Sequence, residues 1–139
     1  MKLGMSIEYA RDPLGQLAKA PDYERAGIDM IWVAEAYGLD AVSVMGYLAS
    51  ITERVEIASG ILPIYTRTPS LLAQTAVGLD TLSDGRFILG LGASGPQVIE
   101  GWHGVPYQKP LQTTREVIEI CRKIWAREEP VTYEGSRFT

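Results

Sequence analysis

The sequence has very few residues of the types that bind metals or form disulfides. Its 139 residues include one cysteine, Cys121, and one histidine, His103, which excludes an internal disulfide and a His/Cys metal cluster. Redox chemistry in such a chain therefore requires a bound cofactor. Basic residues are also few, since 13 of them against 17 acidic residues give a net charge of -4 and form no basic stripe. Nucleic acid is not an expected partner.

Long hydrophobic runs are absent as well. No apolar stretch approaches the roughly 18 residues of a membrane span, and the chain does not start with a signal-peptide pattern. We therefore expect a cytoplasmic protein without a membrane partner. Hydrophobic residues make up 46% of the chain and charged residues 22%, which is ordinary for a globular domain with a real core.

Four short apolar runs recur along the chain at intervals of about 30 residues, the length of a βα unit. Such runs are typical of parallel strands that are buried on both faces. No linker rich in serine and glycine divides the chain, so we expect the four units to belong to one domain. The predicted strands cover residues 3–7, 29–34, 55–61 and 86–91.

Helical patterns fill the intervals between these strands. Pro21 interrupts the first pattern and predicts two short helical pieces within residues 14–26. Asp40 is placed as the N-cap of the second helix. The third helix has Thr68 as its cap and Pro69 at its first position, and Gly85 follows its last turn.

A fourth helix and a hairpin complete the predicted elements. The helix covers residues 111–126, and the hairpin covers residues 130–139 around Glu134 and Gly135. The inner face of the helix is predicted to carry Val117, Ile118, Cys121, Ile124 and Trp125. Two α/β folds fit this series: a doubly wound sheet, or half of an eight-stranded barrel, which needs about 250 residues in full. The pattern alone does not separate them.

Residues 57–69 are the most informative stretch for function. A buried strand runs into Ser59 and Gly60, and an arginine-bearing loop with Arg67 leads to the start of a helix. A strand end, a glycine and a helix N-terminus so close together can hold a phosphate or a flat ring. Arg67 is a candidate partner for an anionic ligand, with a surface ion pair as the alternative.

Residues 90–95 match the dinucleotide fingerprint G-x-G-x-x-G. In a dinucleotide fold this motif follows the first strand and opens a long helix, whereas here it follows the fourth predicted strand. We therefore favour a loop that binds a phosphate or a ring on another α/β scaffold, and a plain structural turn is the second interpretation.

Glu35 and His103 are the candidate catalytic residues. Glu35 follows the second strand in phase with Ile31 and Val33, so its carboxylate is expected at the C-terminal edge of the sheet. There it could move a proton or bind a cofactor ring, or it is simply a solvated loop residue. His103 follows the glycine loop and could act as an acid or a base, although a lone loop histidine more often bonds to backbone.

Three stretches of the chain carry a family resemblance: M-I-W-V-A-E-A-Y-G-L-D from Met30, S-G-I-L-P-I-Y-T-R-T-P from Ser59, and L-S-D-G-R-F-I-L-G-L-G-A-S-G-P-Q-V-I-E-G-W-H-G-V-P-Y from Leu82. Together they resemble the luciferase-like monooxygenase superfamily, and within it the oxidoreductases that depend on the deazaflavin coenzyme F420. The resemblance implies the N-terminal half of a (β/α)8 barrel. It also implies hydride transfer between C5 of F420 and a small organic substrate, although some relatives use FMN and oxygen instead.

The resemblance assigns roles to individual residues. It implies a cis peptide bond between Gly60 and Ile61 against the cofactor ring, and it places Glu35 at the acidic position of the family. Ala36 stands where some sugar-oxidising relatives have a histidine, so their acid–base assignment does not transfer. The loop near the cofactor phosphate corresponds to Gly92, Ala93, Ser94 and Gly95.

The chain is shorter than a complete barrel. We expect residues 1–139 to form one partial barrel domain that stops before the fifth strand, and this fragment could lack activity by itself. Its open edges would favour a homo-oligomer. An FMN-dependent monooxygenase of the same fold and a noncatalytic half-barrel that only self-associates are the alternative functions.

Overall fold

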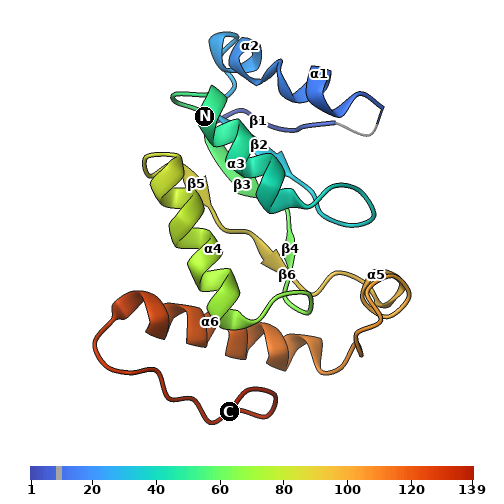
Figure 1. The fold of residues 1–139 in the computed structure, drawn as a ribbon, viewed down its shortest axis with the longest axis vertical. Coiled ribbons are helices and arrows are strands. Elements are labelled where there is room, and N and C mark those ends of the chain that lie inside the picture. The colour runs from blue at the N-terminus through green and yellow to red at the C-terminus, as the bar shows by residue number, and fades with distance from the viewer. Residues whose placement is uncertain (9–10) are drawn as a thin grey trace. The chain divides into compact units, whose positions relative to one another are not determined.

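The computed structural model describes residues 1–8 and 11–139, in which short strands alternate with helices (Figure 1). The strands are β1 (Gly4–Ser6), β2 (Met30–Val33), β3 (Glu56–Ser59), β4 (Leu62–Pro63), β5 (Phe87–Ile88) and β6 (Leu91–Gly92). The helices are α1 (Pro13–Leu17), α2 (Ala20–Arg25), α3 (Ala41–Ile51), α4 (Pro69–Leu82), α5 (Pro96–Ile99) and α6 (Pro110–Ala126).

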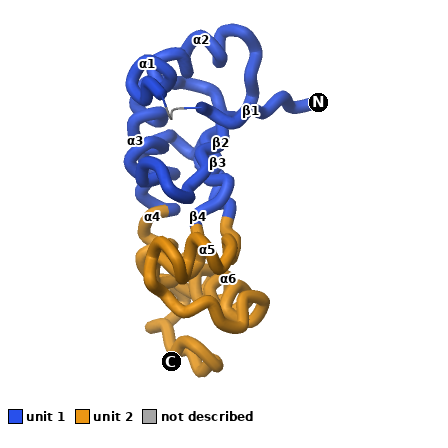
Figure 2. Tube along the Cα trace, turned by 90° about the vertical axis from the view of Figure 1, so that its right-hand side faces the viewer, with its two compact units in different colours: residues 1–62, 76–90 blue, residues 63–75, 91–139 orange. Residues whose placement is uncertain are grey.

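The described chain divides into two compact units (Figure 2). The first comprises residues 1–62 and 76–90, and the second comprises residues 63–75 and 91–139. The first unit contains α1 to α3 and the strands β1, β2, β3 and β5, whereas the second contains β6, α5, α6 and the C-terminal segment, which is residues 127–139. That residues 1–139 belong to one partial barrel domain stays a prediction.

The main sheet is parallel, and its strand order decides between the two folds left open by the sequence pattern. The order is β1-β2-β3-β5, so each strand lies beside the one that precedes it in this series. A doubly wound sheet reverses its order part-way across, and no reversal occurs among these four strands. The arrangement is that of one half of a (β/α)8 barrel, as expected.

The two faces of this sheet differ in exposure. On one face Ile31, Val33 and Ile57 are at most 1% exposed, and α3 packs against β2 and β3. On the opposite face, which would line the interior of a closed barrel, Trp32 is 37% exposed and Ile88 is 38% exposed. The half sheet therefore has a buried helix-covered face and an open apolar face.

The helix boundaries confirm the predicted caps. α1 and α2 are the two short pieces expected around Pro21, and the Asp40 carboxylate accepts from the Ser43 N–H at 2.8 Å at the start of α3. Thr68 Oγ1 accepts from the Leu71 N–H at 3.2 Å at the start of α4. Gly85 adopts φ +76° after α4, and its N–H donates to the Asp80 carbonyl, which closes the helix.

The predicted inner face of α6 is partly wrong. Val117 and Cys121 are buried as expected, but Ile118 and Ile124 are half-buried and Trp125 is 40% exposed. The buried stripe is instead completed by two polar residues and one isoleucine, Thr113, Glu116 and Ile120. Thr113 and Glu116 can be buried because each makes hydrogen bonds, which a pattern of hydrophobic residues does not reveal.

The predicted hairpin at residues 130–139 is also wrong. This segment forms no strand, and its only backbone turn bond within these residues runs from the Gly135 N–H to the Phe138 carbonyl at 2.8 Å. The N–H groups of Ser136, Arg137 and Phe138 donate to the Glu116 carboxylate, at 2.9, 3.0 and 3.2 Å. The Glu116 side chain of α6 thus bonds the backbone N–H groups that a partner strand would have bonded in a hairpin.

Candidate functional site

Glu35 lies just beyond the C-terminal end of β2, where the sequence predicted it. Val33 pairs with Ser59 in the parallel register, and the Gly60 N–H donates to the Val33 carbonyl at 2.8 Å, so Glu35 and Gly60 leave the sheet at one edge. The half-buried Glu35 carboxylate accepts from the Ala41 N–H at 2.8 Å, at the first residue of α3. One oxygen of this candidate acid thereby helps to cap α3.

The peptide bond between Gly60 and Ile61 is cis, which confirms the expectation from the family resemblance. Gly60 is exposed, and Ile61 is half-buried. A Cβ atom added to Gly60 would lie 3.2 Å from Cδ1 of Trp32, so a larger residue would press on that indole ring. The strand end therefore presents a short piece of backbone without a side chain at the edge that carries Glu35.

Ser59 and Gly90 join the ends of β3 and β5. The Ser59 hydroxyl accepts from the Gly90 N–H at 2.8 Å and donates to the Gly90 carbonyl at 2.9 Å. A Cβ on Gly90 would lie 2.0 Å from the Ser59 carbonyl oxygen, so no other residue fits without moving the backbone. The first glycine of the G-x-G-x-x-G match thus serves strand packing, and the Ser59 hydroxyl has its donor committed inside the protein.

The rest of the glycine loop lies in the second unit. Gly92, Ala93, Ser94 and Gly95 are all half-buried, and Ser94 adopts a left-handed conformation with φ +57°. The Ile64 N–H donates to the Gly92 carbonyl at 3.0 Å, and the Tyr107 hydroxyl donates to the Ser94 carbonyl at 3.2 Å. The following helix, α5, has four residues, so the long helix of a dinucleotide fold is not present here.

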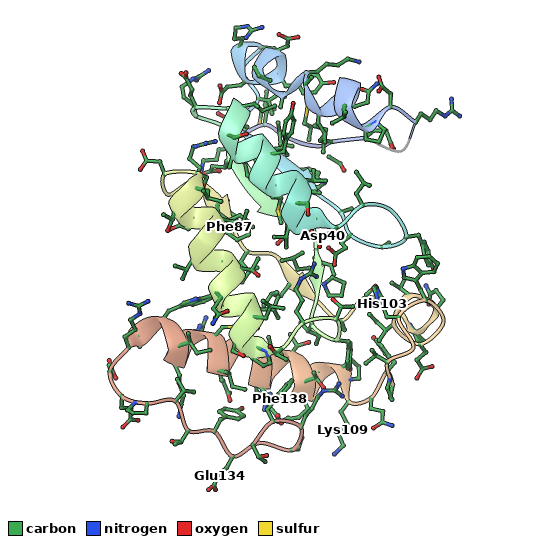
Figure 3. The ribbon with its side chains drawn as sticks, in the orientation of Figure 1. Asp40, Phe87, His103, Lys109, Glu134 and Phe138 are labelled. Carbon is green, nitrogen blue, oxygen red and sulfur yellow. The ribbon has the colours of Figure 1, made fainter. Side chains whose placement is uncertain are left out.

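Arg67 and His103 also lie in the second unit. Arg67 is half-buried in the turn before α4, and its guanidinium donates to Thr66 Oγ1 at 3.3 Å. His103 is exposed in the turn after α5, where its backbone N–H donates to the Val98 carbonyl at 3.1 Å (Figure 3). An anion-binding role for Arg67 and a catalytic role for His103 stay predictions.

Sequence reasoning did not single out Tyr65 and Tyr107. Tyr65 is 6% exposed, its hydroxyl donates to the Gln108 carbonyl at 2.6 Å, and its ring centroid lies 5.2 Å from that of Tyr107. Both tyrosines fall inside the stretches that carry the family resemblance. No local pattern could have joined them, because they are 42 positions apart in the printed sequence.

Arg86 is a second residue whose importance the sequence did not reveal. Its guanidinium group donates hydrogen bonds of 2.6 to 3.2 Å to backbone and side-chain oxygens. The acceptors are the carbonyls of Ser83, Val55, Thr52 and Ala49 and the Thr52 hydroxyl. These bonds fasten the end of α3 and the start of β3 to the start of β5. Arg86 therefore acts at the N-terminal ends of the strands, opposite the edge that carries Glu35.

Two buried carboxylates have lowered pKa values, and both accept backbone N–H bonds. Burial alone would raise the pKa of Glu24, but bonds from the Val55, Arg54 and Glu53 N–H groups and the charge of Arg54 outweigh it and lower the pKa. The Gln112 amide and the N–H groups of Ser136 and Arg137 lower the pKa of Glu116 to about 2 against the effect of burial. Each carboxylate therefore fixes a segment of backbone: Glu24 holds residues 53–55, and Glu116 holds residues 136 and 137.

The comparison with known proteins decides the family. The family described as luciferase-like monooxygenase matches residues 4–139, which is almost the whole chain. The chain belongs to the luciferase-like monooxygenase family. A protein of Mycobacterium tuberculosis with the name "Putative coenzyme F420-dependent oxidoreductase Rv3520c" is 45% identical over 140 residues, covering 99% of this chain and 40% of its own length. The 5,10-methylenetetrahydromethanopterin reductase of Methanolobus tindarius is 34% identical, over 89% of this chain and 38% of its own length.

Solved structures of luciferase-like enzymes share the fold. The coenzyme F420 dependent tetrahydromethanopterin reductase from Methanopyrus kandleri has a TM-score of 0.85 and 25% identity over 99% of this chain and 43% of its own. The oxygenating constituent of 3,6-diketocamphane monooxygenase from Pseudomonas putida, in complex with FMN, also has a TM-score of 0.85, at 23% identity and the same coverage. This luciferase-like chain thus spans about 40% of the length of the relatives that it matches.

No helix in residues 1–8 and 11–139 combines the length and the apolar character that crossing a membrane requires. The cytoplasmic location expected from the sequence stays a prediction. By their names, these relatives are enzymes: a coenzyme F420-dependent oxidoreductase, two reductases and an FMN-bound monooxygenase constituent.

Proposed function

We propose that this chain is the N-terminal half of an F420-dependent oxidoreductase that transfers a hydride between the deazaflavin and a small organic substrate. The observation that carries the proposal is the 45% identity, along 99% of the chain, to the relative whose name specifies coenzyme F420. A second relative, at 34% identity, is a methylenetetrahydromethanopterin reductase, whose name describes reduction of a small organic molecule.

The residues at the end of β2 and β3 fit a flat ring. Gly60 is exposed and has no side chain, the backbone at Gly60–Ile61 follows the strand directly, and the Glu35 carboxylate lies at the same sheet edge. The Glu35 carboxylate is held at this edge by the bond that it accepts from the Ala41 N–H. We assign Glu35, Gly60 and Ile61 to the ring, and Ser59 supports them through its bonds to Gly90.

The glycine loop and Arg67 fit an anionic tail. Gly92, Ala93, Ser94 and Gly95 have small side chains, so the backbone N–H groups of this loop can approach a phosphate closely. Arg67 supplies a permanent positive charge of the kind that binds phosphate in bidentate fashion. We assign these five residues to the phosphate and side chain of the cofactor.

When bound, F420 supplies the hydride acceptor or donor at C5 of its deazaflavin ring. The residues of this chain would orient that ring, neutralise the phosphate and hold a proton at Glu35 Oε1 or at an imidazole nitrogen of His103. Which of these two residues exchanges a proton with the substrate depends on the substrate, so both remain catalytic candidates.

An FMN-dependent monooxygenase of the same fold is the second candidate function. It is favoured by the TM-score of 0.85 with the FMN-bound diketocamphane enzyme, a likeness that at 23% identity concerns the fold alone. A noncatalytic half-barrel that only self-associates is the third candidate. Exposed Trp32 and Ile88 on the open sheet face support self-association, and therefore a homo-oligomer, in all three cases.

A fluorescence titration of the purified 139-residue chain with F420 and, separately, with FMN tests these functions. The proposal predicts saturable binding of F420 that is tighter than binding of FMN. Tighter binding of FMN, together with oxygen consumption when the flavin is reduced, would favour the monooxygenase. Binding of neither cofactor by a chain that circular dichroism shows to be folded would contradict both enzymatic functions.

A further inference from the structure

Tyr107 is fixed at both of its ends to the segment around the glycine loop. Its hydroxyl donates to the Ser94 carbonyl at 3.2 Å, and its backbone N–H donates to the Glu100 carboxylate at 2.9 Å. Ser94 is the loop residue with φ +57°, a conformation that residues other than glycine adopt rarely. Tyr107 thus bonds to the backbone of residues 92–95 at the residue whose conformation most needs support.

The ring of Tyr107 is held in turn by Tyr65. The two ring centroids lie 5.2 Å apart with the planes tilted by 42°, an arrangement that is favourable for aromatic pairs. Tyr65 is 6% exposed, and its hydroxyl donates at 2.6 Å to the carbonyl of Gln108, the residue next to Tyr107. Tyr65 therefore holds both the ring of Tyr107 and the backbone that follows it.

The C-terminal segment contacts this pair at Tyr65. The Arg137 guanidinium carbon lies 4.9 Å from the centroid of the Tyr65 ring, within the range of a cation–π contact. The backbone N–H of Arg137 donates to the buried carboxylate of Glu116 at 3.0 Å, so the position of this residue is fixed from α6. Contacts thus run without interruption from Glu116 through Arg137, Tyr65 and Tyr107 to Ser94, all within the second unit.

We propose that Tyr107 is a positioning residue of the cofactor loop, and that Tyr65 and Arg137 couple the conformation of this loop to the C-terminal segment. The inference rests on the proposed function, because it assumes that residues 92–95 receive the cofactor phosphate. A loop with small side chains has few other means of staying in one conformation, and a preorganised loop binds its ligand with a smaller loss of entropy. Tyr107 itself is not assigned a contact with the cofactor.

The test compares Tyr107→Phe with Tyr47→Phe as the matched control. Both variants remove one tyrosine hydroxyl, but Tyr47 lies in α3 of the first unit, outside the contacts that run from Glu116 to Ser94. Nitrogen-15 relaxation, measured without cofactor, should show order parameters at Ala93, Ser94 and Gly95 that fall from about 0.85 to below about 0.7 in Tyr107→Phe only. The affinity for F420 should fall about tenfold in the same variant, as expected for one lost hydrogen bond.

The outcomes separate this inference from the proposed function. Unchanged order parameters in a folded Tyr107→Phe would overturn the inference, whatever the cofactor does. Lower order parameters in that variant, with no F420 binding by the wild type, would support the positioning role and contradict the proposed function. If Tyr107→Phe does not fold, Glu100→Ala releases the other end of Tyr107 from an exposed site, and the same three amides should then become more mobile. Rigid amides in Glu100→Ala would equally overturn the inference.

Discussion

At the scale of single residues, Glu35 combines a structural contact with a candidate role in cofactor binding. One of its oxygens accepts from the Ala41 N–H, and nearby Asp40 makes a comparable bond to the Ser43 N–H, each at 2.8 Å. Both carboxylates thus support the first turn of α3. Only Glu35 is assigned a contact with the cofactor ring, which makes the two residues a matched pair for mutation.

We predict that Glu35→Gln weakens F420 binding about tenfold, because the glutamine loses the charge that strengthens a hydrogen bond to the ring. The amide oxygen can still accept from the Ala41 N–H, so the thermal unfolding temperature should change little. Asp40→Asn is the control, since asparagine is as good an N-cap as aspartate. Fluorescence titration provides the measurement, and equal affinities of the two variants would remove Glu35 from the ring site.

Glu24 and Glu116 predict how stability depends on pH. Their folded-state pKa values are lowered from 4.5, so each contributes stability that is fully present above the unfolded pKa and is lost as the pH falls through the folded pKa. For Glu116 this loss extends down to about pH 2.

We therefore expect the urea midpoint of the wild type to be constant above about pH 5 and to decrease steadily below it. Glu24→Gln should lower the midpoint at neutral pH and flatten this decrease, because glutamine does not titrate. Glu134→Gln, at an exposed position in the C-terminal segment, should leave both features unchanged. A Glu24→Gln curve parallel to that of the wild type would show that the bonds to residues 53–55 do not determine the acid sensitivity.

At the scale of elements, Arg86 joins three of them. Its side chain donates to carbonyls at the end of α3, before β3 and after α4, and a lysine could reach only part of this set. We predict that Arg86→Lys destabilises the chain by about 2 kcal/mol, because buried carbonyls lose their donors. Chemical denaturation measures the change, with Arg122→Lys on the exposed face of α6 as control. If Arg86→Lys were as stable as the wild type, water would replace the guanidinium as the donor to these carbonyls without loss of stability.

The elements also show what the sequence could and could not predict. Caps at Asp40, Thr68 and Gly85 were predictable because they depend on residues within one helical turn. The hairpin at residues 130–139 was not, because the N–H groups of that segment bind Glu116, some 20 positions earlier. A glutamate in step with the apolar residues Val117 and Ile120 was the available signal for that buried contact.

In the candidate site, too, some features could be predicted from the sequence and others could not. The edge with Glu35 and Gly60 followed from strand phase, and the family resemblance correctly indicated the cis bond at Gly60–Ile61. The packing role of Gly90 and the aromatic pair Tyr65–Tyr107 could not be predicted, because each depends on two segments that are distant in sequence. A single sequence can therefore indicate the residues of a site, but not the long-range contacts that position them.

At the scale of the whole molecule, the half sheet predicts self-association. Within the described residues, β1 and β5 each pair with one strand only, and the open face exposes Trp32 and Ile88. We expect sedimentation velocity to show dimers or larger species of the 139-residue chain. Trp32→Glu should shift the population toward monomer, whereas Trp102→Glu, at a side chain that is 61% exposed, should not. A wild type that sediments as a single monomeric species would contradict the prediction.

The position of Trp32 also gives this chain a natural optical probe. Its indole lies on the open sheet face beside Gly60, in the layer that a closed barrel would shield from water. With Trp102 and Trp125 replaced by phenylalanine, any blue shift of the remaining emission would signal that something has come to cover that layer. A ring-shaped ligand that quenches this emission would instead reveal its arrival beside β2, without any label having been attached.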